Sequence, residues 1–141
     1  MIRQEALQAL QGSELIIHAG DIGNLGVLEA LGTIARVVAV RGNIDKDEWA
    51  RTLPESQLVE TGGTFLYVLH DVKQIALDAA ASGFHAVISG HSHLPSTERR
   101  GSVFFLNPGS AGPRRFRLPV SVARLQAKDG WVDAEIIQLK I

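Results

Sequence analysis

The sequence predicts an α/β fold in which helices cover two β-sheets, within one domain that spans residues 1–141. Two observations predict this fold. In the first third of the chain, short apolar runs alternate with a helical pattern, which is the β-α-β order of a parallel sheet. Later apolar runs are joined by Gly-containing turns and indicate antiparallel hairpins. With 141 residues, 45% of them hydrophobic, the chain is long enough for one core.

The first elements follow from the spacing of apolar residues. Residues 2–11 place apolar side chains at helical spacing and end before Gly12, so they are predicted to form a helix. Residues 14–21 (ELIIHAGD) and 36–43 (RVVAVRGN) are predicted strands that end in Gly and a polar residue. A helical pattern over residues 24–35 separates them, so the two strands are expected to be parallel.

The remaining elements are predicted from the same signals. They are, in chain order, a hairpin of residues 56–60 and 64–70 around a Gly-Gly turn, a helix over 72–82, a buried strand over 85–93, a turn leading into a strand over 99–110, and a terminal hairpin over 121–139. The mixture predicts two sheets covered by helices.

Charge, cysteine content and hydropathy exclude several classes of protein. The formal net charge is −1, with acids and bases interspersed, so neither specific nucleic-acid binding nor membrane-surface binding is expected. The absence of cysteine excludes disulfides and thiolate metal sites, so any metal ligands are nitrogen and oxygen atoms. No apolar run approaches the roughly 20 residues of a membrane span and no secretory segment is present, so we expect a soluble cytoplasmic protein.

Five side chains suited to a divalent metal follow the predicted strands: Asp21, Asn43, His70, His91 and His93. The carboxyl ends of strands form the crevice where ligands bind in open α/β sheets, so these side chains can converge. Imidazole and carboxylate together suit zinc, manganese, iron or nickel better than calcium. Taken singly, each residue also has a structural interpretation, as a turn former or a core histidine. His91 and His93 are harder to explain in that way, because i and i+2 side chains leaving a strand point to one side.

With these five residues in this order, the sequence resembles the calcineurin-like metallophosphoesterases, and within them the small bacterial and archaeal phosphodiesterases. The family pattern is D-x-H, G-D, G-N with a nearby acid, H, and then G-H-x-H. The matching stretches are GD at 20–21, GNID at 42–45, LHD at 69–71, GHSH at 90–93 and NPGS at 107–110. The resemblance extends over the whole chain.

The resemblance implies a four-layer α-β-β-α sandwich with a centre for two divalent ions (Mn, Ni, Zn, Fe or Mg) that hydrolyses phosphodiesters with a metal-bound hydroxide. It implies that Asp21 bridges both ions, that the second ion takes Asn43, His70 and His91, and that His93 belongs to the first. Paired ions of this kind neutralise both the attacking and the leaving oxygen. Asp21, Asn43 and His91 are therefore the expected catalytic residues.

One departure from the family is large, because no D-x-H precedes Asp21. The helix resembling RPEALEAL in the family matches residues 3–10, so the first strand and its motif are expected to be missing. The first ion would keep only Asp21 and His93, so we expect one ion at best and weakened or absent activity. We also expect low stability or self-association, and DNA immediately 5′ of the Met1 codon that encodes Asp-x-His-Gly in frame.

The second departure is Ile44, which stands where many relatives have a histidine that acts as general acid. Its absence is expected to slow the departure of poor leaving groups by a factor of about 10² to 10⁴. Asp45 is expected to orient a neighbour, and Asp71 is either an outer-sphere group or a helix N-cap. Arg41 is either a substrate contact or part of a solvated basic face. Asn107 is a further candidate of this outer set.

Two functions remain open at this stage. The first is a metal-dependent phosphodiesterase or phosphatase acting on a small phosphoester. The alternative is a non-catalytic protein-binding scaffold on the same fold, as in a retromer subunit that resembles this chain. Three further arginines near the NPGS turn, Arg114, Arg115 and Arg117, are either anion contacts or a solvated face.

Overall fold

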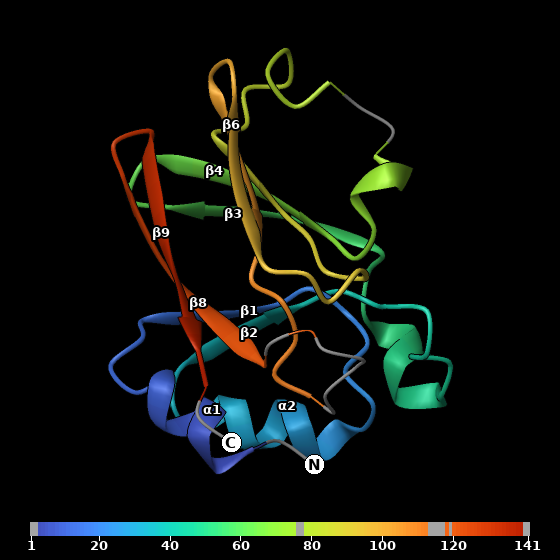
Figure 1. Cartoon of the computed structure of the whole chain (residues 1–141). Coiled ribbons are helices and arrows are strands. Elements are labelled where there is room, and N and C mark those ends of the chain that lie inside the picture. The colour runs from blue at the N-terminus through green and yellow to red at the C-terminus, as the bar shows by residue number, and fades with distance from the viewer. Residues whose placement is uncertain (1–2, 76–77, 113–117, 119, 140–141) are drawn as a thin grey trace.

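The computed structural model describes residues 3–75, 78–112, 118 and 120–139. Helices and strands alternate over the first third of the chain, and strands dominate the rest (Figure 1). The elements in order are α1 (Gln4–Ala9), β1 (Leu15–His18), α2 (Leu25–Gly32), β2 (Arg36–Ala39), η1 (Glu48–Thr52), β3 (Ser56–Thr61), β4 (Thr64–Leu69), η2 (Val72–Gln74), β5 (Ala86–Ile88), β6 (Ser96–Arg100), β7 (Val103–Asn107), β8 (Ser121–Lys128) and β9 (Trp131–Gln138).

A five-stranded mixed sheet forms one half of the molecule, in the order β3-β4-β5-β7-β6. Strands β4, β5 and β7 are parallel, and the hairpins β3-β4 and β6-β7 add an antiparallel strand at each edge. Strands β1 and β2 pair in parallel, and β8 and β9 form an antiparallel hairpin. The predicted α/β class, the β-α-β unit and both hairpins are therefore confirmed.

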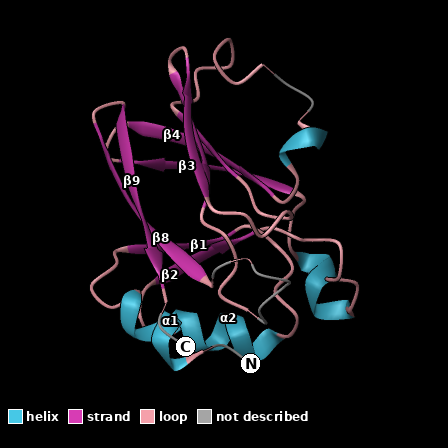
Figure 2. Cartoon of the chain, viewed as in Figure 1, coloured by secondary structure: helices cyan, strands magenta, loops and turns pink. Residues whose placement is uncertain are grey.

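Helices α1 and α2 form one outer layer, next to the layer of β1, β2, β8 and β9, which packs on the five-stranded sheet (Figure 2). On the far face of that sheet, the 3-10 turn η2 is the helical element among the described residues. Half-buried residues of β1, such as Ile17, and of β8, such as Leu125, pack against the same central core cluster. The outer faces of these strands are covered by α1 and α2, through Ala6 and Leu31 among others. The five-stranded sheet supplies the most deeply buried part of the core, which comprises Leu66, Val68, Ala86, Ile88, Phe104 and Leu106.

The second layer is divided into two strand pairs. Among the described residues, β1 is paired only with β2, and β8 only with β9. Both pairs nevertheless pack their inner faces on one core, so they belong to the same layer. None of the described helices is long and apolar enough to cross a membrane.

The helix predicted over residues 72–82 is wrong. The described part of this segment contains only the 3-10 turn η2 and a further turn in which Ser82 N–H donates to Asp78 O at 2.9 Å. Ile75 has extended backbone angles (φ −63°, ψ 124°), which end the helical run. Val72 and Ile75 pack on the face of the five-stranded sheet that is turned away from the central core, against the cluster of Leu69, Ala79, Val87 and Val103. Tertiary packing therefore overrides the helical pattern.

Two further boundaries differ from the sequence prediction. The strand predicted over 85–93 ends at Ile88, so Ser89 to His93 form a loop. The strand expected within 99–110 is present as β7, but it is preceded by β6, whose residues are all exposed and lack the apolar alternation of a half-buried strand. Helix α1 occupies residues 4–9 of the helix predicted over 2–11.

Candidate metal centre

Three loops meet where the strands of the two layers end, and glycines allow their close approach. A Cβ atom on Gly20 would lie 2.6 Å from Nδ1 of His70 and 2.9 Å from the Cα atom of Gly42. A Cβ atom on Gly42 would overlap Asp21. Only glycine fits at these two positions, so the sequence GD after β1 and GN after β2 brings Asp21 and the second loop together.

His70, at the end of β4, is the central residue of the site and is 6% exposed. Its Nδ1 atom lies 2.8 Å from Ala19 O, and its Nε2 atom lies 3.3 Å from Oδ2 of Asp21 and 3.2 Å from Nδ1 of His91. Because a carbonyl can only accept, Nδ1 of His70 carries a proton. In the neutral ring, Nε2 then carries a lone pair, which faces the carboxylate of Asp21. A metal ion beside these two atoms would balance the lone pair and the carboxylate.

The spacing of these donor atoms fits a metal ion. A tetrahedral ion with bonds of about 2.0 Å separates its ligand atoms by about 3.3 Å. The Asp21–His70 and His70–His91 separations of 3.3 and 3.2 Å match this value. Within the ranges that the structure describes, no three His, Asp or Glu side chains already form a closed metal cluster. The spacing therefore fits a metal ion for two atom pairs taken separately, and both pairs share Nε2 of His70.

The backbone at the site is held in a conformation that side chains rarely adopt. Asp21, His91 and His93 have positive φ angles of 55°, 70° and 62°. Such angles cost energy in residues other than glycine and concentrate at functional sites. They also show that the argument from strand alternation was wrong for His91 and His93, because this segment is not extended. The left-handed turns, not a strand, orient the two imidazoles.

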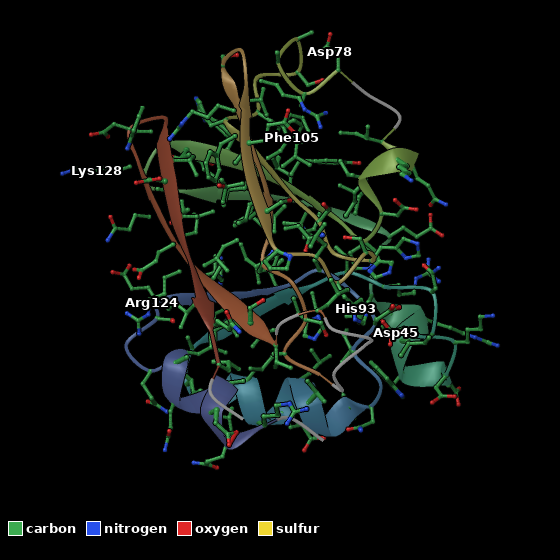
Figure 3. All side chains as sticks on the ribbon, in the orientation of Figure 1. Asp45, Asp78, His93, Phe105, Arg124 and Lys128 are labelled. Atoms are coloured by element: carbon green, nitrogen blue, oxygen red, sulfur yellow. The ribbon has the colours of Figure 1, made fainter. Side chains whose placement is uncertain are left out.

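The remaining two candidate ligands lie in the same loops. Asn43 is exposed in the turn after β2, between Gly42 and Ile44, and the Ile44 N–H donates to Oδ1 of Asp21 at 3.1 Å. His93 lies in the loop after β5, in the same central region as Asp45 (Figure 3). The structure thus joins Asp21, His70 and His91 in one contact network, with Asn43 beside it.

Asp45 holds two loops together and is only 5% exposed. Its carboxylate accepts hydrogen bonds from the backbone N–H groups of Ile22, Gly23 and Gly42, at 2.9 to 3.1 Å. Burial raises the pKa of Asp45, but these three hydrogen bonds and the nearby His18 outweigh burial, so the pKa lies below its usual value. Burial lowers the pKa of His18, against smaller opposing effects from Asp45 and Asp21.

Asp71 is the N-cap of η2, and its second carboxylate oxygen faces His91. Its Oδ1 atom accepts from the N–H of Lys73 at 3.0 Å and caps η2, while Oδ2 lies 3.9 Å from Nε2 of His91. Asn107, at the end of β7, donates from Nδ2 to Gly90 O at 3.0 Å and to Oγ of Ser92 at 3.1 Å. Asn107 therefore fixes the loop that carries His91.

Arg41 is directed to another partner. Its guanidinium lies 3.4 Å from a carboxylate oxygen of Glu55, and the backbone N–H of Arg41 donates to Pro54 O. A surface groove of about 570 Å³ lies beside this region, lined by residues 36–39, 53–54 and 57–60, and it includes none of the candidate ligands. Arg114, Arg115 and Arg117 lie outside the described residues.

Comparison with known proteins decides the family. A family model described as the calcineurin-like phosphoesterase superfamily domain matches residues 1–130. The chain belongs to the calcineurin-like phosphoesterase superfamily. It is 33% identical to a probable metallophosphoesterase of Methanothermobacter thermautotrophicus, over 97% of this chain and 83% of that protein. It is 31% identical to the phosphodiesterase YfcE of Escherichia coli K12, over 84% of this chain and 76% of YfcE.

The fold of this calcineurin-like phosphoesterase also matches a solved structure from a eukaryote. Vps29 of Entamoeba histolytica, solved in complex with Zn²⁺, has a TM-score of 0.76 and 24% identity, over 98% of this chain and 90% of Vps29. Superfamily members are phosphoesterases that normally bind divalent metals. The resemblance inferred from GD, GNID, LHD and GHSH is thereby confirmed.

Sequence reasoning did not name two contributors to this candidate site. Ala19 acts through its backbone carbonyl, which accepts from His70, so no side-chain signal marks it. Ser92 accepts from Asn107 and from the Leu94 N–H, and it stands between the two histidines of GHSH. Its position in that motif was the available signal.

Proposed function

We propose that this member of the superfamily hydrolyses phosphodiesters and takes a divalent metal ion as cofactor. One observation carries the proposal. The Ala19 carbonyl holds the proton of His70 on Nδ1, and Nε2 then points with its lone pair to Oδ2 of Asp21 and toward Nδ1 of His91. A divalent cation balances this arrangement of lone pairs and negative charge without a second proton.

Asp21, Asn43, His70 and His91 would hold this ion. Asp21 and His93 would contribute to the other ion of the pair that the family resemblance implies. Manganese, nickel, zinc, iron and magnesium all suit nitrogen and oxygen donors of this kind. When bound, such an ion polarises phosphoryl oxygens and lowers the pKa of a coordinated water.

The chain's own residues orient the centre and set its limits. Ala19 O fixes the tautomer of His70, and Asn107 fixes the loop of His91. Asp45 holds the loops after β1 and β2 in register. Ile44 beside Asp21 carries no proton for a leaving group, so substrates with good leaving groups are expected to react fastest and overall activity to be weak.

A protein-binding scaffold is the second candidate, since one observation favours it. Ile44 and Leu94 beside the site are 61% and 53% exposed, and exposed apolar side chains are typical of docking surfaces. Vps29, which shares the fold, is one of the solved structures that match. The contacts of Asp21, His70 and His91, however, offer ligands for the metal ion that the enzyme would use.

The test combines metal content with activity. Purified protein is loaded with Mn²⁺, its metal is counted by mass spectrometry, and hydrolysis of bis-p-nitrophenyl phosphate is followed. His91→Ala should lose metal and activity together, whereas His85→Asn, which keeps an acceptor for the Phe65 N–H, should retain both. Undiminished hydrolysis by His91→Ala would reject the proposal.

A further inference from the structure

Two exposed apolar side chains directly follow candidate metal ligands. Six large apolar residues among those described are exposed: Leu25, Ile44, Leu58, Phe65, Leu94 and Trp131. Ile44 comes after Asn43 and is 61% exposed, and Leu94 comes after His93 and is 53% exposed. Exposed apolar side chains next to a charged centre are not needed to hold an ion, so they point to a role in binding a ligand.

The Ile44 position is fixed by hydrogen bonds at the site itself. Its N–H donates to Oδ1 of Asp21 at 3.1 Å, and its carbonyl accepts from the Lys46 N–H at 3.1 Å. The neighbouring Asp45 is buried and bonded to Gly42. The side chain of Ile44 is therefore exposed in a turn that has little freedom to bury it elsewhere.

The position of Leu94 is fixed by hydrogen bonds in the loop after β5. Its N–H donates to Oγ of Ser92 at 3.2 Å, and Ser92 is in turn held by Asn107 at 3.1 Å. The next residue, Pro95, lies so close to Gly109 that a Cβ atom there would come within 3.3 Å of the proline ring. Leu94 is thus held beside His93, as Ile44 is held beside Asn43.

We infer that Ile44 and Leu94 form an apolar rim that selects phosphodiesters carrying an aryl or branched alkyl substituent. This inference rests on the proposed function. With the phosphate at the ligand network, an apolar ester group would lie over these side chains and remove their surface from water, which favours binding. The guanidinium of Arg41, three residues before Ile44, is paired with Glu55. We therefore expect the ester group to contact the apolar side chains and not this arginine.

The test uses two diesters with the same leaving group, methyl p-nitrophenyl phosphate and phenyl p-nitrophenyl phosphate, with Mn²⁺-loaded protein. The measured quantity is the ratio of kcat/KM for the phenyl over the methyl diester. Comparison between variants cancels the intrinsic reactivities of the two diesters. Ile44→Ser and Leu94→Ser should each lower this ratio by about fivefold, a typical loss for one apolar contact. Leu58→Ser, on β3 and also 53% exposed, is the matched control and should leave the ratio unchanged.

The outcomes separate the two proposals. If the diesters are hydrolysed but the ratio is the same in wild type, Ile44→Ser and Leu94→Ser, the apolar rim is overturned while the phosphodiesterase stands, and the exposed pair then fits a protein-docking surface. If Mn²⁺-loaded wild type hydrolyses neither diester, the proposed function fails and the rim falls with it. A lower ratio in both serine variants, with Leu58→Ser unaffected, supports both.

Discussion

Nε2 of His70 lies 3.3 Å from Oδ2 of Asp21, while the other ring nitrogen is bound to a backbone carbonyl. The carbonyl fixes which nitrogen carries the proton, so the pair consists of a lone pair and a carboxylate. This relationship makes the negative charge of Asp21 the property on which the proposed cation binding depends. The same network places His91 3.2 Å from His70.

Asp21→Asn should therefore weaken Mn²⁺ binding by more than about 100-fold, although the side chain keeps its size. The reason is that an amide has no negative charge to balance the ion. Titration calorimetry with Mn²⁺ measures the change, and Asp133→Asn, an exposed carboxylate on β9, serves as the control. Equal Mn²⁺ affinity in Asp21→Asn and wild type would contradict a metal site at this network.

Asn107→Ala should reduce activity through the position of a loop rather than through the fold. The change removes two hydrogen bonds, to Gly90 O and Ser92 Oγ, that hold the segment carrying His91. Loss of such outer contacts typically costs about 10- to 100-fold in metal affinity or activity. Mn²⁺ affinity and hydrolysis of bis-p-nitrophenyl phosphate are measured together. Asn24→Ala, whose side chain makes no capping hydrogen bond to α2, is the control. Equal Mn²⁺ affinity and equal activity in Asn107→Ala and Asn24→Ala would show that the two hydrogen bonds of Asn107 do not position the His91 loop for metal binding.

The part of the site that could be predicted from the sequence is the part that depends on strand order. Asp21, His70 and His91 each follow a strand of a parallel arrangement, and their convergence follows from that topology. The left-handed angles of Asp21 and His91 could not be predicted, because the local sequence favours ordinary turns and tertiary contacts impose the strain. The helix prediction over 72–82 was wrong for the same reason, since Ile75 packs against the face of the five-stranded sheet that is turned away from the central core.

The carboxylate of Asp45 should contribute more to stability than to chemistry. It accepts three backbone N–H groups while buried, so Asp45→Asn should lower the free energy of unfolding at pH 7 by about 2 to 4 kcal/mol, measured by urea denaturation. The neighbouring exposed Asp47→Asn should change it by less than about 0.5 kcal/mol.

The pH dependence gives an independent check on Asp45. Its pKa in the folded protein lies below the value of 3.8 expected in the unfolded chain. Between these two values the unfolded state binds more protons, so the stability that Asp45 supplies is complete above pH 3.8 and is lost as the pH falls through the folded pKa. The difference between wild type and Asp45→Asn should shrink over this range. A difference that is constant from pH 7 to pH 3 would show that packing, not the charge, accounts for it.

Ile44→His should add a proton donor beside the ligand network. The Ile44 N–H is held by Asp21, so a histidine at this position would begin beside the ligand network with its side chain toward solvent. General acids accelerate the departure of poor leaving groups by about 10² to 10⁴, and a newly introduced histidine should reach about 10-fold on a diester with an alkyl leaving group. The p-nitrophenyl diester should gain little, because its leaving group departs without a proton. The added rate should fall above the histidine pKa of about 6.5. Ile44→Gln is the control, since it adds polarity without a group that titrates near neutral pH. Two outcomes would contradict this prediction: an equal gain in rate in Ile44→His and Ile44→Gln, or a gain in Ile44→His that persists as the pH rises above 6.5. Either would mean that removing the apolar side chain, and not adding an acid, raises the rate.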